Sequence, residues 1–273
     1  MPEGHTIHRN AEDLNEAFAG QALAVTSPQG RFADSAARIN HTAFVQAQAV
    51  GKHLLMEFAN DAIVHVHLGL YGAWNINPLV NEKAAPPVGQ VRLRLLGEQA
   101  VADLRGPTQC ELVTSSEVAL LLNRLGPDPL RVDADEKRAW NVISKSSTPI
   151  CVLLMRQDIV SGVGNVYRAV VLFRLGIDPL TPGRNVDRKV WLKIWRDLVT
   201  LMRIGVEIGQ IDTVRSKHLP ERTGRAPRID RHGGEVYVYR RESQPCLVCS
   251  TPILKREVAA RNLFWCPTCQ KSF

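Results

Sequence analysis

The sequence predicts an α+β protein with more than one domain, and three features of the chain carry that prediction. The stretch from about residue 22 to 112 is patterned as short strands, that from about 133 to 209 as helices, and the end carries four closely spaced cysteines. The 273 residues can bury one large or two medium cores. A composition of 45% hydrophobic and 22% charged residues is typical of soluble globular proteins.

The first part of the chain predicts a β-rich domain with a leading helix. Residues 5–18 place apolar side chains at helical spacing, and Gly20 suits the helix end. Segments rich in Val, Ile and Phe then alternate with Gly, Asn and Asp, which predicts strands at 21–27, 44–50, 53–58, 62–68, 91–96 and 99–104. A loop at 78–89 and a short helix at 115–124 complete a predicted domain over residues 1–124.

A proline-rich boundary separates this part from a helical one. Residues 125–130 (LGPDPL) hold two prolines and a glycine. Helical patterns follow at 135–145, 149–157, 165–176 and 187–209, then a basic loop at 212–234 and a strand at 235–241. The predicted second domain covers 125–235 and the third 236–273. Trp191 and Trp195, four residues apart on the last helix, are expected in the core.

The net charge and the length of the apolar segments indicate which kinds of binding partner this protein can have. Lys and Arg exceed Asp and Glu by 34 to 27, which gives a net charge of +7. This excess favours a polyanion such as nucleic acid, although a generic basic surface would give the same balance. The apolar runs are too short to span a bilayer, and MPEGHTIHRN lacks the pattern of a signal peptide, so we expect a cytoplasmic protein without a membrane partner.

Four cysteines near the end of the chain predict a structural zinc ion. Cys246 and Cys249 form one Cys-x-x-Cys pair, and Cys266 and Cys269 form a second after sixteen residues. Two such pairs can place four thiolates around one tetrahedral Zn²⁺. Four sulfurs leave no open position, so the ion is expected to be structural and not catalytic. Two disulfides are the alternative, which a reducing cytoplasm disfavours.

A glycine-rich turn opens the helix at Asn165. Gly162 and Gly164 permit a tight turn with exposed N–H groups, and the positive end of a helix dipole lies there. The pattern suits an anion site. It suits a simple helix cap at least as well, because asparagine is a common N-cap residue.

The N-terminus carries a possible nucleophile. A small second residue such as Pro2 normally permits removal of Met1, which would leave a secondary amine. An α-amino group has a pKa of about 8, so roughly a tenth of it is neutral at pH 7. A neutral amine can attack a sugar carbon and form an iminium, and Glu3 can move protons beside it. Taken alone, Pro2-Glu3 indicates the start of a helix more strongly than a catalytic pair.

The combination resembles the formamidopyrimidine-DNA glycosylase/endonuclease VIII family along the full chain. The resemblance rests on five motifs in order: PEGHTIHR at the start, GKHLL at 51–55, HLGLYG at 67–72, GVGNVY at 162–167 and RNLFWCPTCQ at 261–270. It implies a two-layer β-sandwich with flanking helices, a helix–two-turns–helix domain, and a zinc ribbon whose hairpin enters DNA. The PEG opening and LYG at 70–72 are closer to the endonuclease VIII branch.

The resemblance also implies roles for single residues. Pro2 would be the nucleophile, Glu3 the acid and base, and Lys52 an essential lysine that contacts phosphate at the lesion. Asn165 and Arg261 would hold phosphates of the pinched strand. Three residues would fill the void left by a flipped base: Leu70, Tyr71 and, in a loop that departs from the pattern of the guanine-lesion branch, Arg105. His65 and His67 share a strand face, but no third ligand for a metal is visible.

One position departs from the family. The helix after the GVGN turn usually continues N-x-Y-x-x-E, and here the glutamate position is Val170. A carboxylate that would help to orient or protonate the site is therefore missing. We expect DNA binding and some lyase activity to remain, because Pro2, Glu3 and Lys52 are present.

These observations together predict a monomeric base-excision-repair enzyme of the nucleoid that acts on damaged DNA without a small-molecule cofactor. It would remove oxidised bases, chiefly pyrimidines, and cut the strand by β,δ-elimination. Three alternatives remain open: an enzyme that prefers oxidised purines, a damage-binding protein weakened by Val170, and a zinc-ribbon RNA-binding protein. The last would explain the charge but not Pro2-Glu3.

Overall fold

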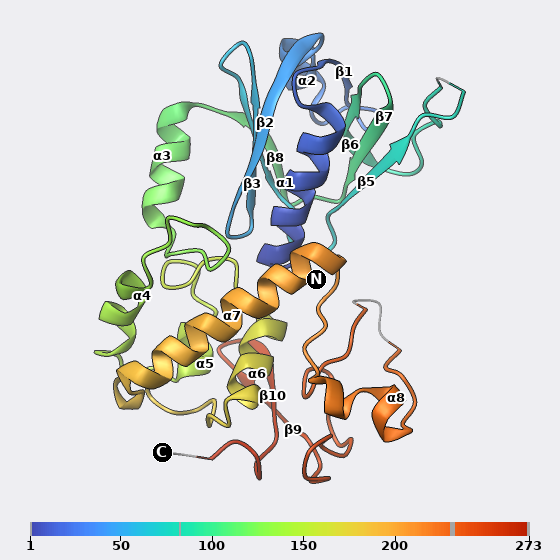
Figure 1. Ribbon diagram of the computed structural model, residues 1–273. Coiled ribbons are helices and arrows are strands. Elements are labelled where there is room, and N and C mark those ends of the chain that lie inside the picture. Colours follow the sequence, from blue (N-terminus) through green and yellow to red (C-terminus); the bar gives the residue numbers. More distant parts are fainter. Residues whose placement is uncertain (1, 82, 230–232, 272–273) are drawn as a thin grey trace. The chain divides into compact units, whose positions relative to one another are not determined.

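The computed structural model describes residues 2–81, 83–229 and 233–271, and the chain divides into two compact units, Met1–Arg124 and Leu125–Phe273 (Figure 1). Each has its own hydrophobic core. Among the described residues, no helix combines the length and hydropathy that crossing a membrane requires. The further division of the second unit at residue 235 stays a prediction.

The first unit is a helix-flanked β structure. Its elements, in chain order, are α1 (Gly4–Phe18), β1 (Ala22–Thr26), α2 (Ala33–Ile39), β2 (Thr42–Val50), β3 (His53–Phe58), β4 (Ile63–His67), β5 (Ala73–Pro78), β6 (Val91–Leu96), β7 (Ala100–Arg105), β8 (Gln109–Val113) and α3 (Ser115–Arg124).

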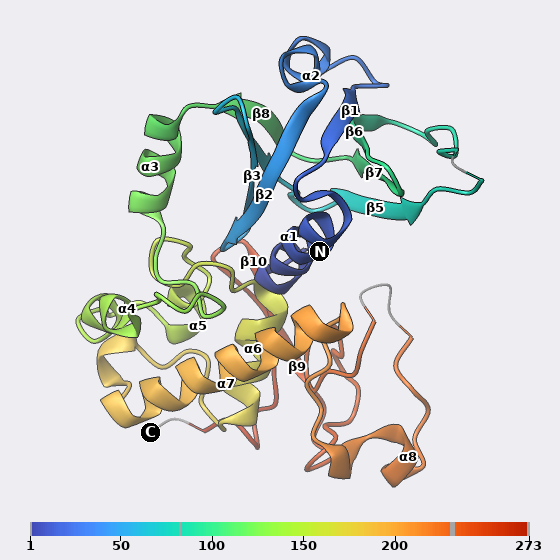
Figure 2. The same ribbon diagram turned by 45° about the horizontal axis from the view of Figure 1, so that its top comes forward.

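The strands form two antiparallel layers that share β1. The strand order is β5-β7-β6-β1-β2-β3-β4-β8. The start of β1 pairs with β2, and its end pairs with β6, so one strand changes partner at the corner (Figure 2). Side chains alternate along β6, and its buried positions Val91, Leu93 and Leu95 are fully covered. The sheet is not closed, because β5 and β8 remain edges.

Helix α1 lies antiparallel to β2 and is fastened to it by one side chain. The carboxamide of Asn15 donates to the carbonyl of Ala47 at 2.9 Å and accepts from the Ala47 N–H at 2.6 Å. At the other end of the contact, Gly20 N–H donates to the carbonyl of Phe44 at 2.9 Å. Residues 15 to 20 of the helix end therefore face residues 47 to 44 of the strand, and the helix start points toward the end of β2.

The second unit is built around a buried helix. Its elements are α4 (Glu136–Ile143), α5 (Ile150–Leu153), α6 (Asn165–Arg174), η1 (Gly183–Asn185), α7 (Arg188–Ile208), η2 (Ser216–His218), α8 (Pro220–Thr223), β9 (Leu254–Val258) and β10 (Arg261–Trp265). Nine of the ten residues of α6 are buried. Trp191 is fully buried and donates from Nε1 to Glu136 at 2.9 Å, and Trp195 packs against the same core, as the sequence predicts.

The cysteine-rich end is joined to the helical part of the same unit. The Gln270 side chain accepts from the N–H of Cys266 at 3.0 Å and donates to the carbonyl of Ile177 at 3.0 Å. Lys271 N–H donates to the carbonyl of Gly176 at 3.2 Å. These bonds attach the second cysteine pair to the end of α6.

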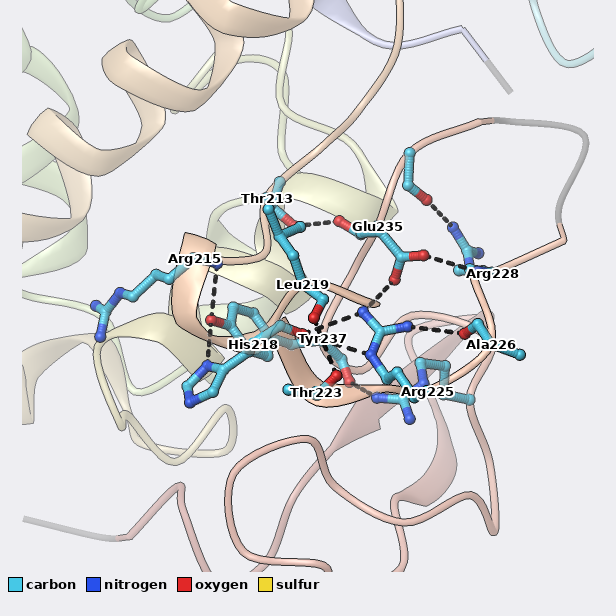
Figure 3. Close-up of polar contacts among 12 residues, drawn as sticks. Thr213, Arg215, His218, Leu219, Thr223, Arg225, Ala226, Arg228, Glu235 and Tyr237 are labelled. Carbon is cyan, nitrogen blue, oxygen red and sulfur yellow. Dashed lines mark hydrogen bonds and ion pairs between the residues drawn. The ribbon is translucent and has the colours of Figure 1, made fainter. Parts of the chain in front are cut away.

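The prediction of a strand at 235–241 is wrong. Figure 3 shows Glu235 and Tyr237 in polar contact with residues of the basic segment: the Glu235 carbonyl accepts from Thr213 N–H at 2.9 Å, and its carboxylate pairs with Arg225 at 2.6 Å. The Tyr237 hydroxyl accepts from Arg215 N–H at 3.0 Å. The segment has strand-like residues, but among the described residues no strand pairs with it. Helix α2 and strands β5 and β8 are elements that the sequence did not predict.

Replacing Asn15 tests the contact between α1 and β2. Asn15→Ala removes both partners of Ala47, whose backbone is buried, and an unsatisfied buried backbone group costs about 1–3 kcal/mol. We expect the free energy of unfolding in urea to fall by about 2–3 kcal/mol. Glu12→Ala, on the exposed face of the same helix, should change it by less than about 0.5 kcal/mol. Equal effects of the two variants would contradict this account of the contact.

Candidate active site and metal centre

Pro2 and Glu3 directly precede the first turn of α1. Glu3 is the N-cap residue, with φ −122° and ψ −179°, and its carbonyl accepts from Thr6 N–H at 3.0 Å. The helix-start interpretation is therefore correct as a description of local structure. The Glu3 side chain is fully buried and makes no capping hydrogen bond, so the helix does not explain why a carboxyl group stands here. Met1 lies outside the described residues.

Lys52 occupies the two-residue turn between β2 and β3, as the sequence predicts. Gly51 has φ +60°, which a residue with a side chain rarely adopts.

The contact between Asn15 and Ala47 sets how Lys52 lies relative to the helix start. Gly4 is eleven helical residues from Asn15, about 16 Å at 1.5 Å per residue. Lys52 is five residues beyond Ala47, about 17 Å along the strand and in the same direction. Both views show the start of α1 and the β2–β3 turn at the same end of the first unit (Figure 1 and Figure 2).

Three histidines gather beside Lys52, on the polar face of β3 and β4. His53 Nδ1 lies 2.9 Å from His65 Nε2, and the rings of His53 and His67 are 5.0 Å apart. Burial is the main cause that lowers the pKa of His53 to about 3, and the neighbouring imidazoles, Lys52 and Arg124 contribute to the same shift. Burial also lowers the pKa values of His65 and His67. The sequence placed His65 and His67 on one face but missed His53, because only strand pairing brings it across.

Leu70 and Tyr71 lie in an exposed turn whose backbone conformation requires glycine at position 69. Tyr71 is 87% exposed and Leu70 50%, which is unusual for side chains of this size. Gly69 has φ +67°, and a Cβ there would lie 2.3 Å from the side chain of Thr108. Thr108 in turn donates from its N–H to the carbonyl of His67 at 3.0 Å. The turn after β4 therefore packs against the loop that carries Thr108. The side chains of Leu70 and Tyr71 are exposed on that turn.

Arg105 is placed differently from Leu70 and Tyr71. It is the last residue of β7, half-buried, and its Cα pairs with Ala73 of β5. In the amide orientation that satisfies both groups, the Asn75 oxygen accepts from Arg105 at 3.2 Å. The side chain is thus engaged within the sheet. A role for Arg105 in filling the DNA stack stays a prediction.

Asn165 is the first residue of α6 and is not its cap. The N-cap is Gly164, and the Asn165 side chain leaves the helix: Nδ2 donates to the carbonyl of Asn262 in β10 at 3.0 Å. The simple-cap alternative for this residue is wrong. Val170, five residues later in the same helix, is fully buried in the core of the second unit. A glutamate at that position would be buried among apolar side chains.

Arg261 is the exposed first residue of β10, directly after the hairpin turn. The two turn residues, Ala259 and Ala260, have φ +49° and +56°, the type I′ geometry that favours asparagine and glycine. The turn thus holds two alanines in a backbone conformation that is costly for residues with a Cβ.

The four cysteines form the metal centre that the sequence predicts. Their sulfur atoms lie within 4.8 Å of one another, and two pairs are 3.4 Å (Cys249, Cys266) and 3.9 Å (Cys246, Cys269) apart. A tetrahedral zinc ion with Zn–S bonds of about 2.3 Å needs sulfurs about 3.8 Å apart, so the set fits one structural Zn²⁺. In the part of the chain that the structure describes, this is the one cluster suited to a metal; the three histidines do not form another.

Comparison with known proteins agrees with this architecture. Family models match residues 1–110 (formamidopyrimidine-DNA glycosylase N-terminal domain), 125–217 (its H2TH domain) and 243–271 (zinc finger found in FPG and IleRS). "Endonuclease 8 1" of Mycobacterium tuberculosis is 47% identical over 99% of this chain and 100% of its own length. Formamidopyrimidine-DNA glycosylase of Thermus thermophilus is 28% identical over 99% and 98%.

A solved structure has the same fold. Lactococcus lactis Fpg in a complex with abasic-site DNA superposes with a TM-score of 0.79 over 98% of this chain and 99% of that one, at 20% identity. The chain therefore belongs to the formamidopyrimidine-DNA glycosylase/endonuclease VIII family of base-excision-repair DNA glycosylases. The expected β-sandwich, helix–two-turns–helix domain and zinc finger are confirmed.

The histidine cluster predicts how stability depends on pH. The pKa of His53 is about 3 in the folded protein and about 6.5 in an unfolded chain, so below pH 6.5 the unfolded state binds more protons. Stability is retained above pH 6.5 and is lost as the pH falls toward 3. Between pH 7.5 and 5, His53→Gln should reduce the loss in free energy of unfolding by about 1–2 kcal/mol. Urea titrations at both pH values measure this, and an unchanged loss would contradict it.

Proposed function

We propose that this chain is a bifunctional DNA glycosylase and abasic-site lyase with Pro2 as its nucleophile. The observation that carries the proposal is the pair at the N-terminus: a proline whose amine is free once Met1 is removed, followed by a buried carboxyl group that does not cap the helix. The neutral amine attacks C1′ of the damaged nucleotide, and the bond to the base breaks. The base leaves with the electron pair of that bond and takes up the proton that the amine loses, and the sugar opens to an iminium linked to Pro2.

Glu3 moves the protons that this sequence of steps requires. It protonates the sugar oxygen as the ring opens, and as a carboxylate it then accepts protons during β- and δ-elimination. The two eliminations cut the strand on both sides, and water hydrolyses the iminium to free Pro2. Lys52, at the same end of the unit as the helix start, binds the phosphate beside the opened sugar.

The remaining predicted residues hold DNA open. Asn165 and Arg261 bind backbone phosphates, which fix position without reading sequence. Leu70 and Tyr71 enter the duplex from their exposed turn and occupy the space of the extruded nucleotide. Arg105 completes this set by turning away from Asn75 when DNA is bound. The enzyme acts as a monomer on damaged DNA in the nucleoid.

Borohydride trapping tests the nucleophile. Protein from which Met1 has been removed, confirmed by mass, should form a covalent adduct with an abasic-site duplex, because borohydride reduces the iminium. The same chain with a blocked N-terminal amine should form none. Glu3→Gln should still be trapped on an abasic site but should release a damaged base at least about a hundredfold more slowly.

A result without any adduct would reject the lyase mechanism. It would favour the alternative motivated by Val170, a damage-binding protein that grips a tetrahydrofuran site but cleaves no abasic site.

Oxidised pyrimidines are the proposed substrates. The PEG opening and LYG at 70–72 favour the endonuclease VIII branch, and the Mycobacterium relative carries an endonuclease 8 name. We expect faster excision of thymine glycol and 5-hydroxyuracil than of 8-oxoguanine opposite cytosine, measured in single turnover on matched duplexes. The relatives named formamidopyrimidine-DNA glycosylase support the other possibility, oxidised purines, and a preference for 8-oxoguanine would establish it.

A further inference from the structure

A buried arginine, Arg168, donates a hydrogen bond to Asn165, the proposed phosphate-binding residue. Arg168, one helical turn after Asn165 in α6, is 1% exposed. Burial of a guanidinium group costs free energy unless its N–H groups donate hydrogen bonds, so Arg168 needs acceptors close to it.

The guanidinium joins three elements of the second unit. Nε donates to Asn165 Oδ1 at 2.8 Å, and one terminal nitrogen donates to the carbonyl of Cys151 in α5 at 3.0 Å. The other terminal nitrogen donates to the carbonyl of Asn262 in β10 at 3.4 Å. That same carbonyl accepts from Asn165 Nδ2 at 3.0 Å, so Arg168, Asn165 and the β10 backbone form a closed ring of hydrogen bonds.

This ring fixes which way the Asn165 amide faces. A guanidinium group only donates, so the atom of Asn165 that faces Arg168 has to be the carbonyl oxygen. The NH₂ group then lies on the opposite side and uses one proton for the carbonyl of Asn262. Without a donor at position 168, the Asn262 carbonyl alone would hold the amide in this orientation, and the Asn165 oxygen would lose the partner that opposes rotation of the side chain.

The amide borders a polar cavity. The cavity has a volume of about 320 Å³ and is lined by Asn165, Tyr239, Arg240, Glu242, Lys255, Asn262 and Phe264. Arg240 lies over the ring of Tyr239 at 5.5 Å, and Lys255 pairs with Glu242 at 2.8 Å. The pair of Lys255 with Glu242 leaves Arg240 as the excess positive charge in the lining. An N–H group beside it suits an anion, whereas an amide oxygen in that place would repel one.

We propose that Arg168 is a positioning residue for DNA binding. It holds the Asn165 amide with its N–H side toward the phosphate, and it attaches the hairpin that carries Arg261 to helix α6. The proposal rests on the function proposed above for Asn165, and it adds a residue that does not itself contact DNA.

A double-mutant cycle tests whether Arg168 acts through Asn165. The affinity of the zinc-loaded chain for a tetrahydrofuran-site duplex is measured for Arg168→Met, Asn165→Ala and the double variant, with melting temperature and zinc content as checks on folding. Each single change should weaken binding roughly tenfold, the size of one hydrogen bond to a charged group. The double variant should bind about as weakly as Asn165→Ala alone.

The cycle needs a control and a second variant. Arg174→Met is the matched control, since Arg174 lies in the same helix and pairs with Asp197 at 2.8 Å; it should lower the melting temperature and leave affinity unchanged. Arg168→Lys keeps one donor for the Asn165 oxygen and should recover part of the affinity. If Arg168→Met does not fold, the cycle is run with Arg168→Lys.

Two results would overturn the proposal. Effects that multiply, so that the double variant binds roughly a hundredfold more weakly, would show that Arg168 acts independently of Asn165. An Asn165→Ala variant with full affinity would remove the contact through which Arg168 is proposed to act. Borohydride trapping is read separately, so the lyase mechanism can survive either result.

Discussion

The first unit depends on one contact between a helix and a strand. Asn15 satisfies both the N–H and the carbonyl of Ala47, and this fixes the height of α1 along β2. The start of the helix and the β2–β3 turn then lie at similar distances from the same anchor, so Pro2, Glu3 and Lys52 belong to one end of the sandwich. The amine of Pro2, the proposed nucleophile, is positioned in this way by a residue thirteen positions further along the chain.

Several connections between distant segments fix the positions of side chains in the second unit. Zinc joins the two cysteine pairs, Gln270 joins the second pair to the end of α6, and Arg168 joins the start of α6 to β10. Asn165 and Arg261 come from opposite parts of the sequence, yet β10 carries one and accepts a hydrogen bond from the other. The proposed phosphate-binding residues come from separate elements, so such bonds are needed to hold them in a fixed arrangement.

Burial determines which side chains near the proposed site residues are charged or apolar. Val170 extends the apolar core around α6, and the nearly complete burial of that helix makes an apolar residue favourable there. In the first unit, His53, His65 and His67 stay neutral beside Lys52, because burial and mutual repulsion disfavour their charged forms. Neutral imidazoles leave Lys52 as the cation at that turn, which suits the proposed phosphate contact.

The sequence alone determined the features that depend on local pattern and on spacing. The cysteine pairs required a metal, the long helix at 187–209 followed its apolar period, and Pro2-Glu3 stood out as a helix start with unused chemistry. Tertiary structure decided the rest, because it depends on partners distant in sequence. Residues 235–241 have strand composition, but no strand among the described residues pairs with them. Asn165 has the residue type of a cap but bonds to β10. Arg168 and His53 make their contacts only with groups that folding brings beside them.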